Sequence, residues 1–168
     1  MRIFSALLHV LAPWAGMALL FMTPAGQIRV QDLRTQFVRE PNPVRRAKLL
    51  PKLEQAEFVE IRQHVDGGDY AKALEILGGY RDDIRATQKA LDATGVDPEK
   101  KPAGYKELQI AVRESLRQLN EIFVALPGDW KMGFDDIRRE LETANNRLIV
   151  QLFPHQPGHQ QQSGKTKL

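Results

Sequence analysis

The sequence predicts an all-α fold, either an antiparallel helical bundle or a set of stacked helical hairpins, with about four to five helices. Apolar residues recur at alternating steps of three and four along several stretches of the chain, and proline or glycine stands between these stretches. No segment shows the sustained apolar and polar alternation that a β-strand requires. We therefore expect helices that pack against one another through one apolar face each.

A short first helix is expected over residues 30–40, because three apolar residues recur there at helical spacing before a proline-rich turn. Asn42 then stands as an N-cap with Pro43 in the first helical position. The second helix is expected to bend or restart at Pro51 and to end near Val65. Its apolar face contains Leu50, Leu53, Phe58, Ile61 and Val65.

The third helix is expected to begin after Asp69, which is a good N-cap residue. Gly78 and Gly79 interrupt its pattern, and each costs about 1 kcal/mol relative to alanine inside a helix. The pair therefore predicts a kink or a close approach of another backbone. The apolar face contains Ala73, Leu77, Tyr80, Ile84 and Leu91.

Residues 95–104 form a polar connection rich in turn-forming residues, and two further amphipathic helices follow it, separated by a turn that starts at Pro127. The fourth helix carries Tyr105, Leu108, Val112, Leu116, Leu119, Ile122 and Leu126 on one face. The fifth carries Phe134, Ile137, Leu141, Ala144 and Leu148. Residues 154–168 lack apolar periodicity and are predicted to be disordered, so the helical domain is expected over residues 28–153.

The N-terminus resembles a secretory signal peptide, because Arg2 is followed by an apolar stretch over residues 3–22. Thr23 and Ala25 form a small-residue pair that predicts cleavage after Ala25, which makes residues 1–25 the leader. The stretch is also long enough for an uncleaved membrane anchor. The basic residues that follow would turn the rest of such an anchor toward the cytoplasm. We expect export to the periplasm or to the outer face of the membrane, with tethering if the leader stays uncleaved.

Composition excludes several classes of function. The chain of 168 residues has 24 basic and 21 acidic side chains, interleaved along most predicted helices, which does not favour nucleic-acid binding. It has no cysteine, so disulfides, thiolate metal sites and cysteine nucleophiles are absent.

The run from Gly68 to Leu74, Gly-Asp-Tyr-Ala-Lys-Ala-Leu, resembles the turn that opens the second helix of a tetratricopeptide repeat. Gly68, Tyr70 and Ala73 match that pattern, and Leu77 stands at its next large apolar position. The resemblance extends over about residues 43–94. It implies one helical hairpin of a family that binds peptides or partner proteins.

Two longer runs, PVRRAKLLPKL and EKKPAGYKELQIAVRESLRQL, resemble a group of short exported bacterial helical proteins. This resemblance implies the helical architecture and no particular activity.

No constellation of residues predicts catalysis, a cofactor or a metal site. The carboxylates in the pairs at residues 82–83 and 135–136 point about 100° apart on a helix, so neither pair forms a shared acid–base site. His155 and His159 are four residues apart, but the proline and glycine between them prevent the helical register of a metal site. We predict that the protein is not an enzyme.

Four large apolar residues near predicted helix starts are candidates for partner binding: Tyr70, Trp130, Met132 and Phe134. Core packing at the helix ends is the alternative for these residues. The sequence thus predicts a non-enzymatic interaction module of the cell envelope that binds another envelope protein or itself. A structural homo-oligomer, or a small-ligand carrier or enzyme whose site forms only in three dimensions, stays open as the alternative.

Overall fold

The computed structural model describes residues 25–155, with side chains described from Val30 onward. In this part of the chain there are five α-helices and no strand, which confirms the predicted all-α fold. The helices are α1 (Ala25–Arg39), α2 (Pro43–Asp66), α3 (Tyr70–Asp92), α4 (Tyr105–Ala125) and α5 (Gly128–Leu152).

Two predicted segments fall largely outside the described residues. The predicted leader, residues 1–25, lies outside them except for Ala25, and the predicted cleavage bond after Ala25 lies in the first turn of α1. The predicted disordered tail is described only for Pro154 and His155. None of the described helices is both long and apolar enough to span a bilayer.

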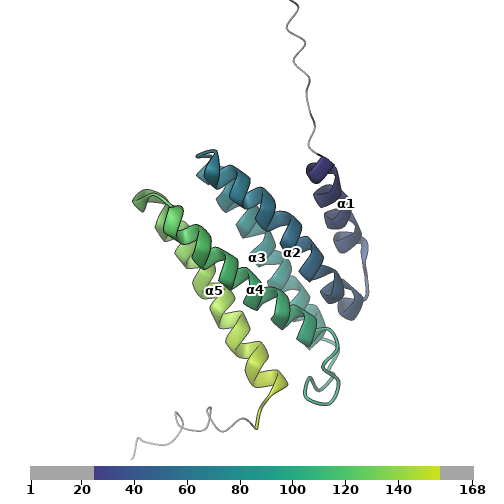
Figure 1. Ribbon diagram of the computed structural model, residues 1–168. Coiled ribbons are helices and arrows are strands. Elements are labelled where there is room, and N and C mark those ends of the chain that lie inside the picture. Colours follow the sequence, from purple (N-terminus) through teal and green to yellow (C-terminus); the bar gives the residue numbers. More distant parts are fainter. Residues whose placement is uncertain (1–24, 156–168) are drawn as a thin grey trace, which may run out of the picture.

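The architecture consists of two helical hairpins, α2–α3 and α4–α5, stacked on each other, with α1 along α2 (Figure 1). The helices of each hairpin are antiparallel, whereas α2 runs parallel to α4 and α3 runs parallel to α5. The largest interfaces join α2 to α3 and α2 to α4. Helix α2 is therefore the centre of the packing, and α1 covers the side of it that faces away from α4.

Local sequence signals set the helix boundaries. The side chain of Asn42 accepts hydrogen bonds from the backbone N–H groups of Val44 and Arg45, both at 3.0 Å, as expected of an N-cap. At the start of α4, Gly104 has a φ of 89°. A Cβ atom at this position would lie 2.7 Å from Leu91, so glycine is required both for the backbone conformation and for the close packing.

The two expected interruptions do not break their helices. Helix α2 passes through Pro51, and α3 passes through Gly78 and Gly79. The group next to Gly79 is a side chain rather than another backbone, because an added Cβ would lie 3.8 Å from the guanidinium of Arg34. The glycine thus leaves room for an arginine of α1 against α3.

The core is a continuous apolar cluster that all five helices share. Phe58 and Tyr80 pack edge to face at its centre, with ring centroids 5.8 Å apart. The largest fully buried side chains are Tyr80, Phe58, Phe134, Leu50, Leu53, Ile61, Leu77, Ile84, Leu91, Leu108, Leu119 and Leu141. Helix α1 contributes Val30 and Phe37, so it is packed on the domain through apolar contacts as well as through Arg34.

Candidate functional site

Two of the predicted partner-binding residues meet at one end of the molecule. Tyr70 begins α3, and Trp130 lies in the first turn of α5. Their ring centroids are 5.9 Å apart at a tilt of 37°, and both side chains are partly exposed. The α2–α3 turn and the α4–α5 turn therefore form a common end, which is also the end where α1 begins (Figure 1).

The other two predicted residues differ in their exposure. Met132 is 76% exposed on the first turns of α5, whereas Phe134 is completely buried. Phe134 belongs to the core, where it anchors α5 beneath the surface. The predicted set thus separates into three surface residues and one core residue.

One surface residue that the sequence analysis did not select belongs to the same end. Val124, near the end of α4, is 83% exposed, the highest value among the large exposed hydrophobic residues. We call Tyr70, Val124, Trp130 and Met132 the apolar tip. The apolar periodicity of α4 does not include Val124, because this residue lies outside the buried face of the helix.

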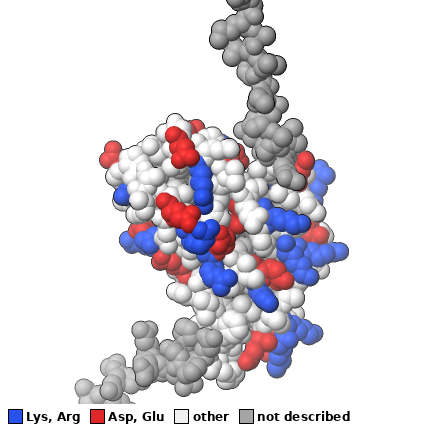
Figure 2. All heavy atoms as spheres, viewed as in Figure 1, with Lys and Arg blue, Asp and Glu red and all other residues white. Residues whose placement is uncertain are grey.

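The apolar tip is bordered by charge. Asp66, Asp69 and Asp129 are exposed in the two turns. On the inner side, Lys131 lies 5.3 Å from the ring centroid of Phe123, a cation–π contact that covers the ring. Figure 2 shows charged groups of both signs interleaved over one face of the molecule.

A second cluster, of buried polar groups, was not predicted from the sequence. Glu54 and Glu57 lie one turn apart on α2, with exposed fractions of 1% and 0%. A signal was present, because both fall at helical spacing from Leu50 and so on the apolar face of the helix. Two charged residues among apolar ones at this spacing predict a buried polar contact.

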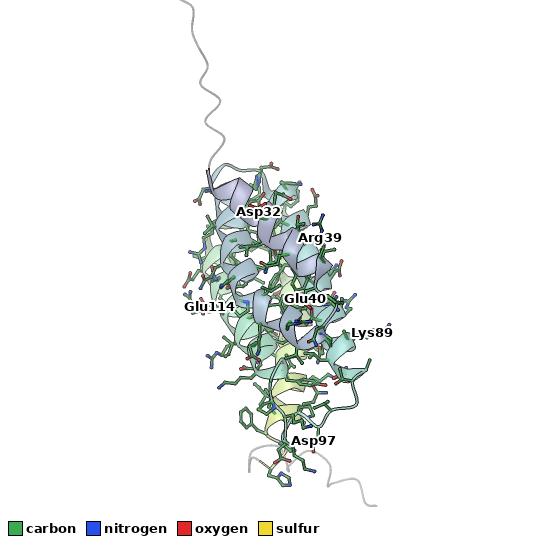
Figure 3. All side chains as sticks on the ribbon, turned by 90° about the vertical axis from the view of Figure 1, so that its right-hand side faces the viewer. Asp32, Arg39, Glu40, Lys89, Asp97 and Glu114 are labelled. Atoms are coloured by element: carbon green, nitrogen blue, oxygen red, sulfur yellow. The ribbon has the colours of Figure 1, made fainter. Side chains whose placement is uncertain are left out.

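The partner of Glu57 is an arginine of α1. The guanidinium of Arg34 donates a hydrogen bond to Oε1 of Glu57, while Oε2 has no hydrogen-bond partner. The same guanidinium lies 3.6 Å from a carboxylate oxygen of Asp83 on α3. Arg34 therefore joins α1 to both helices of the first hairpin. Figure 3 shows α1 and its labelled residues Asp32 and Arg39 on the side of the bundle from which this arginine enters.

The partner of Glu54 is a neutral amide of α4. Nε2 of Gln118 donates a hydrogen bond to Glu54, and Oε1 of Gln118 accepts one from Arg62 at 2.7 Å. Arg62 also lies 3.2 Å from Glu121. Arg62 therefore reaches Glu54 only through the amide of Gln118.

Both carboxyl groups titrate near neutral pH. Burial raises the pKa of Glu54 from 4.5 to about 7, reinforced by the negative charge of Glu114. Burial also raises the pKa of Glu57 to about 7, and the positive charge of Arg34 opposes the rise. The negative charges of Glu54 and Glu57 also act on Tyr80, whose hydroxyl is 2.6 Å from Oγ of Ser115. Burial raises the pKa of Tyr80 well above its ordinary value.

Groups that titrate near pH 7 are suited to acid–base chemistry if a substrate reaches them. Glu54 and Glu57, however, line neither of the two surface grooves described for this protein. The described residues also contain no group of three or more metal-ligating side chains that could hold an ion. The contacts of the cluster join α1, α3 and α4 to α2.

No family model, curated protein or solved structure matches the chain. The assignment of function therefore rests on the chemistry of the surface and of the grooves.

One groove of about 270 Å³ lies between α3 and α5, and another of about 420 Å³ lies between the α3–α4 connection, α4 and the end of α5. The first is lined by Arg81, Ile84, Arg85, Gln88, Glu140, Leu141, Thr143, Ala144 and Arg147. The second is lined by Glu99, Pro102, Lys106, Gln109, Ile110, Arg113, Leu152 and Phe153.

Proposed function

We propose that the protein is a non-enzymatic, exported helical module whose apolar tip binds another protein of the cell envelope. The observation that carries the proposal is that one end of the bundle holds the partly exposed Tyr70–Trp130 pair together with the exposed side chains of Val124 and Met132. Single exposed apolar residues are common on soluble proteins. Two aromatic rings and two almost fully exposed aliphatic side chains at one end are typical of a recognition surface.

The packing supports a recognition role for this end. Trp130 and Tyr70 hold each other across the gap between the two hairpins, so their rings are already ordered before a partner arrives. The close contact of Leu74 with Gly133, at which an added Cβ would lie 2.8 Å away, brings α5 tightly against α3 beneath them. A rigid aromatic pair binds with little loss of conformational entropy.

The charges around the tip define the chemistry of the partner. Three exposed aspartates, Asp66, Asp69 and Asp129, stand in the two turns. A partner that presents an apolar residue flanked by lysine or arginine would be complementary to this border. The proposal includes export, for which the apolar leader over residues 3–22 is the support.

A photo-crosslinking experiment in living cells tests the proposal. A photoreactive amino acid is placed at Val124, which is exposed and outside the core, and in a matched control at Val59, which is 57% exposed on α2. Crosslinked products are identified by mass spectrometry together with the N-terminal peptide of the protein. We expect Val124 to crosslink to one envelope protein through a segment with a basic residue beside an apolar one.

Two results would count against the proposal. Equal crosslinking from Val124 and Val59 would mean that the tip is not a preferred surface. Products that contain only this chain would support the structural homo-oligomer instead. In the same cells, Met132→Asp should abolish the product from Val124 without changing the amount of protein, since Met132 is exposed and contributes little to the core.

A further inference from the structure

The groove between α3 and α5 has polar residues at its ends and an apolar floor. The two helices are parallel, and pairs of residues face each other in register along them: Arg81 contacts Glu140 at 3.6 Å, and Arg147 contacts Asp92 at 2.8 Å. These contacts close the groove at its two ends. Between them the floor consists of Ile84, Leu141 and Ala144.

Gln88 is the exceptional residue of this groove. It lines the groove, its exposed fraction is only 8%, and its Nε2 has no hydrogen-bond partner. A buried amide N–H group without an acceptor is costly in free energy. The last torsion of a glutamine is soft, so the amide nitrogen can turn toward an acceptor in the groove.

Positive charge on the groove walls complements such an acceptor. Arg81, Arg85 and Arg147 line the groove together with one carboxylate, Glu140. Two further carboxylates contact these arginines, Asp82 at Arg81 and Asp92 at Arg147. Glu140 already binds both Arg81 and Arg85. Arg147 lies at the opposite end of the groove, on the α5 side that faces Gln88 of α3. Arg147 contacts Asp92 through Nη2, and the rest of its guanidinium retains free donors.

We propose that this groove binds a small aliphatic carboxylate, with the carboxylate between Gln88 and Arg147 and the hydrocarbon on the apolar floor. A charged hydrogen bond from arginine and a neutral one from the amide would satisfy the two carboxylate oxygens. A carboxylate stands at each end of the groove, but Glu140 occupies two arginines, Arg81 and Arg85, whereas Asp92 contacts a single nitrogen of Arg147. The end at Arg147 therefore has donors left for a ligand carboxylate. A volume of about 270 Å³ fits a short branched chain rather than a long acyl chain.

The test is a titration of the protein, purified in the form that accumulates in cells, with 4-methylpentanoate. The matched probe is 4-methylpentanamide, which has the same shape and no charge. The readout is the side-chain amide resonance of Gln88 in the NMR spectrum. We expect a saturable shift with the carboxylate only, with a dissociation constant on the order of 1 mM for so small a ligand.

Three variants separate the charge from the floor. Arg147→Ala should weaken binding by about tenfold through loss of the charged hydrogen bond. Ala144→Leu should abolish binding by filling the floor without changing any charge. Arg139→Ala is the control, because Arg139 is an exposed arginine of the same helix that does not line the groove. It should bind like the unmodified protein.

Thermal melting verifies that each variant is folded, and Arg147→Ala is the decisive one because its side chain is 60% exposed and supports no core contact. Equal shifts with the carboxylate and the amide would overturn the proposal. So would unchanged binding in Arg147→Ala. These outcomes are independent of the apolar tip, which lies at the end of the bundle where α3 and α5 begin.

Discussion

The two buried glutamates of α2 differ in the group that each carboxyl contacts. Glu57 faces α1 and is paired with a charged guanidinium, while Glu54 faces α4 and is paired with a neutral amide. Both are buried to the same degree, and burial raises both pKa values to about 7. At Glu57, the positive charge of Arg34 is the largest effect that lowers the pKa against burial. At Glu54, the hydrogen bond from Gln118 lowers the pKa too, but it is the weakest of the effects on that group.

The comparison teaches that the two helix interfaces depend differently on pH. The α1–α2 interface contains an ion pair when Glu57 is ionised, so the attraction of Arg34 offsets part of the burial cost that raises the pKa of Glu57. The coupling between Arg34 and Glu57 therefore grows as the pH rises through about 7. The α2–α4 interface contains no opposite charge in direct contact with Glu54, so ionisation there only adds a cost. Four substitutions test or break this contrast, in order of decreasing effect.

The largest effect is expected for Glu54→Gln at alkaline pH. The pKa of Glu54 is raised above its unfolded value near 4.5, so its contribution to stability is full below that pH and is lost as the pH rises through about 7. Glutamine keeps the shape and accepts the same hydrogen bond from Gln118 without a charge. The free energy of unfolding at pH 8 should rise by about 3 kcal/mol, with little change at pH 4.

Urea unfolding at the two pH values, monitored by circular dichroism, measures this difference. The exposed substitution Glu75→Gln is the control, since Glu75 lies on the surface of α3 and its exposed fraction is 70%. A gain of the same size at pH 4 and pH 8 would show that the ionised state of Glu54 is not the cause.

The next effect is expected for Arg34→Met. Without the guanidinium, the ionised Glu57 has no counter-charge in contact and its pKa rises further. The loss should be about 2 kcal/mol at pH 8, less than for a fully buried pair because a third of the Arg34 side chain is exposed. At pH 5 the loss should be smaller, since Glu57 is then protonated.

A double-mutant cycle with Glu57→Gln isolates the pairing of these two residues. The coupling free energy should be larger at pH 8 than at pH 5. A coupling that does not change with pH would mean that Arg34 contributes through packing of its hydrocarbon chain alone.

A smaller and pH-independent effect is expected for Tyr80→Phe. The Tyr80 hydroxyl is fully buried and lies 2.6 Å from Oγ of Ser115. Its removal should cost about 1 kcal/mol, since Ser115 loses one partner but still donates to the backbone carbonyl of Ala111. Equal losses of unfolding free energy at pH 5 and pH 8 confirm the assignment, and a strong pH dependence would contradict it.

The smallest effect is expected for Gly79→Ala. The Cβ atom would lie 3.8 Å from the Arg34 guanidinium, an ordinary contact, and alanine favours the helix. The thermal midpoint should rise, by an amount equivalent to at most about 1 kcal/mol. A fall in the midpoint would show that the Cβ atom displaces the Arg34 guanidinium and so weakens the contact between α1 and α3.

Much of the fold can be predicted from local sequence patterns. The structure contains the elements predicted by the N-cap at Asn42, by the turn at Pro127 and by the helical spacing of Leu50, Leu53 and Ile61. These signals are local because capping and amphipathic periodicity involve residues within a few positions of one another. At Pro51 the sequence predicts a bend or restart and at residues 78–79 a kink or a close approach, and both helices are continuous there. The group next to Gly79 is the side chain of Arg34, a contact distant in sequence that no local pattern indicates.

The candidate site was predicted only in part. Tyr70, Trp130 and Met132 were selected as large apolar residues near helix starts, but nothing in the sequence distinguished them from Phe134, which the core buries completely. Val124 was not selected because exposure depends on which helix covers which face. Whether an apolar side chain is a core residue or a surface residue is decided by its neighbours in space.

The sequence by itself determined the helical class and the approximate limits of the helices, because these depend on composition and on short-range periodicity. Tertiary structure alone decided the partners of Glu54 and Glu57, which come from helices at sequence separations of 64 and 23 residues. It also placed Gln88 beside the arginines of two helices. Such contacts depend on the order and direction in which the hairpins stack, and no local pattern of residues encodes that choice.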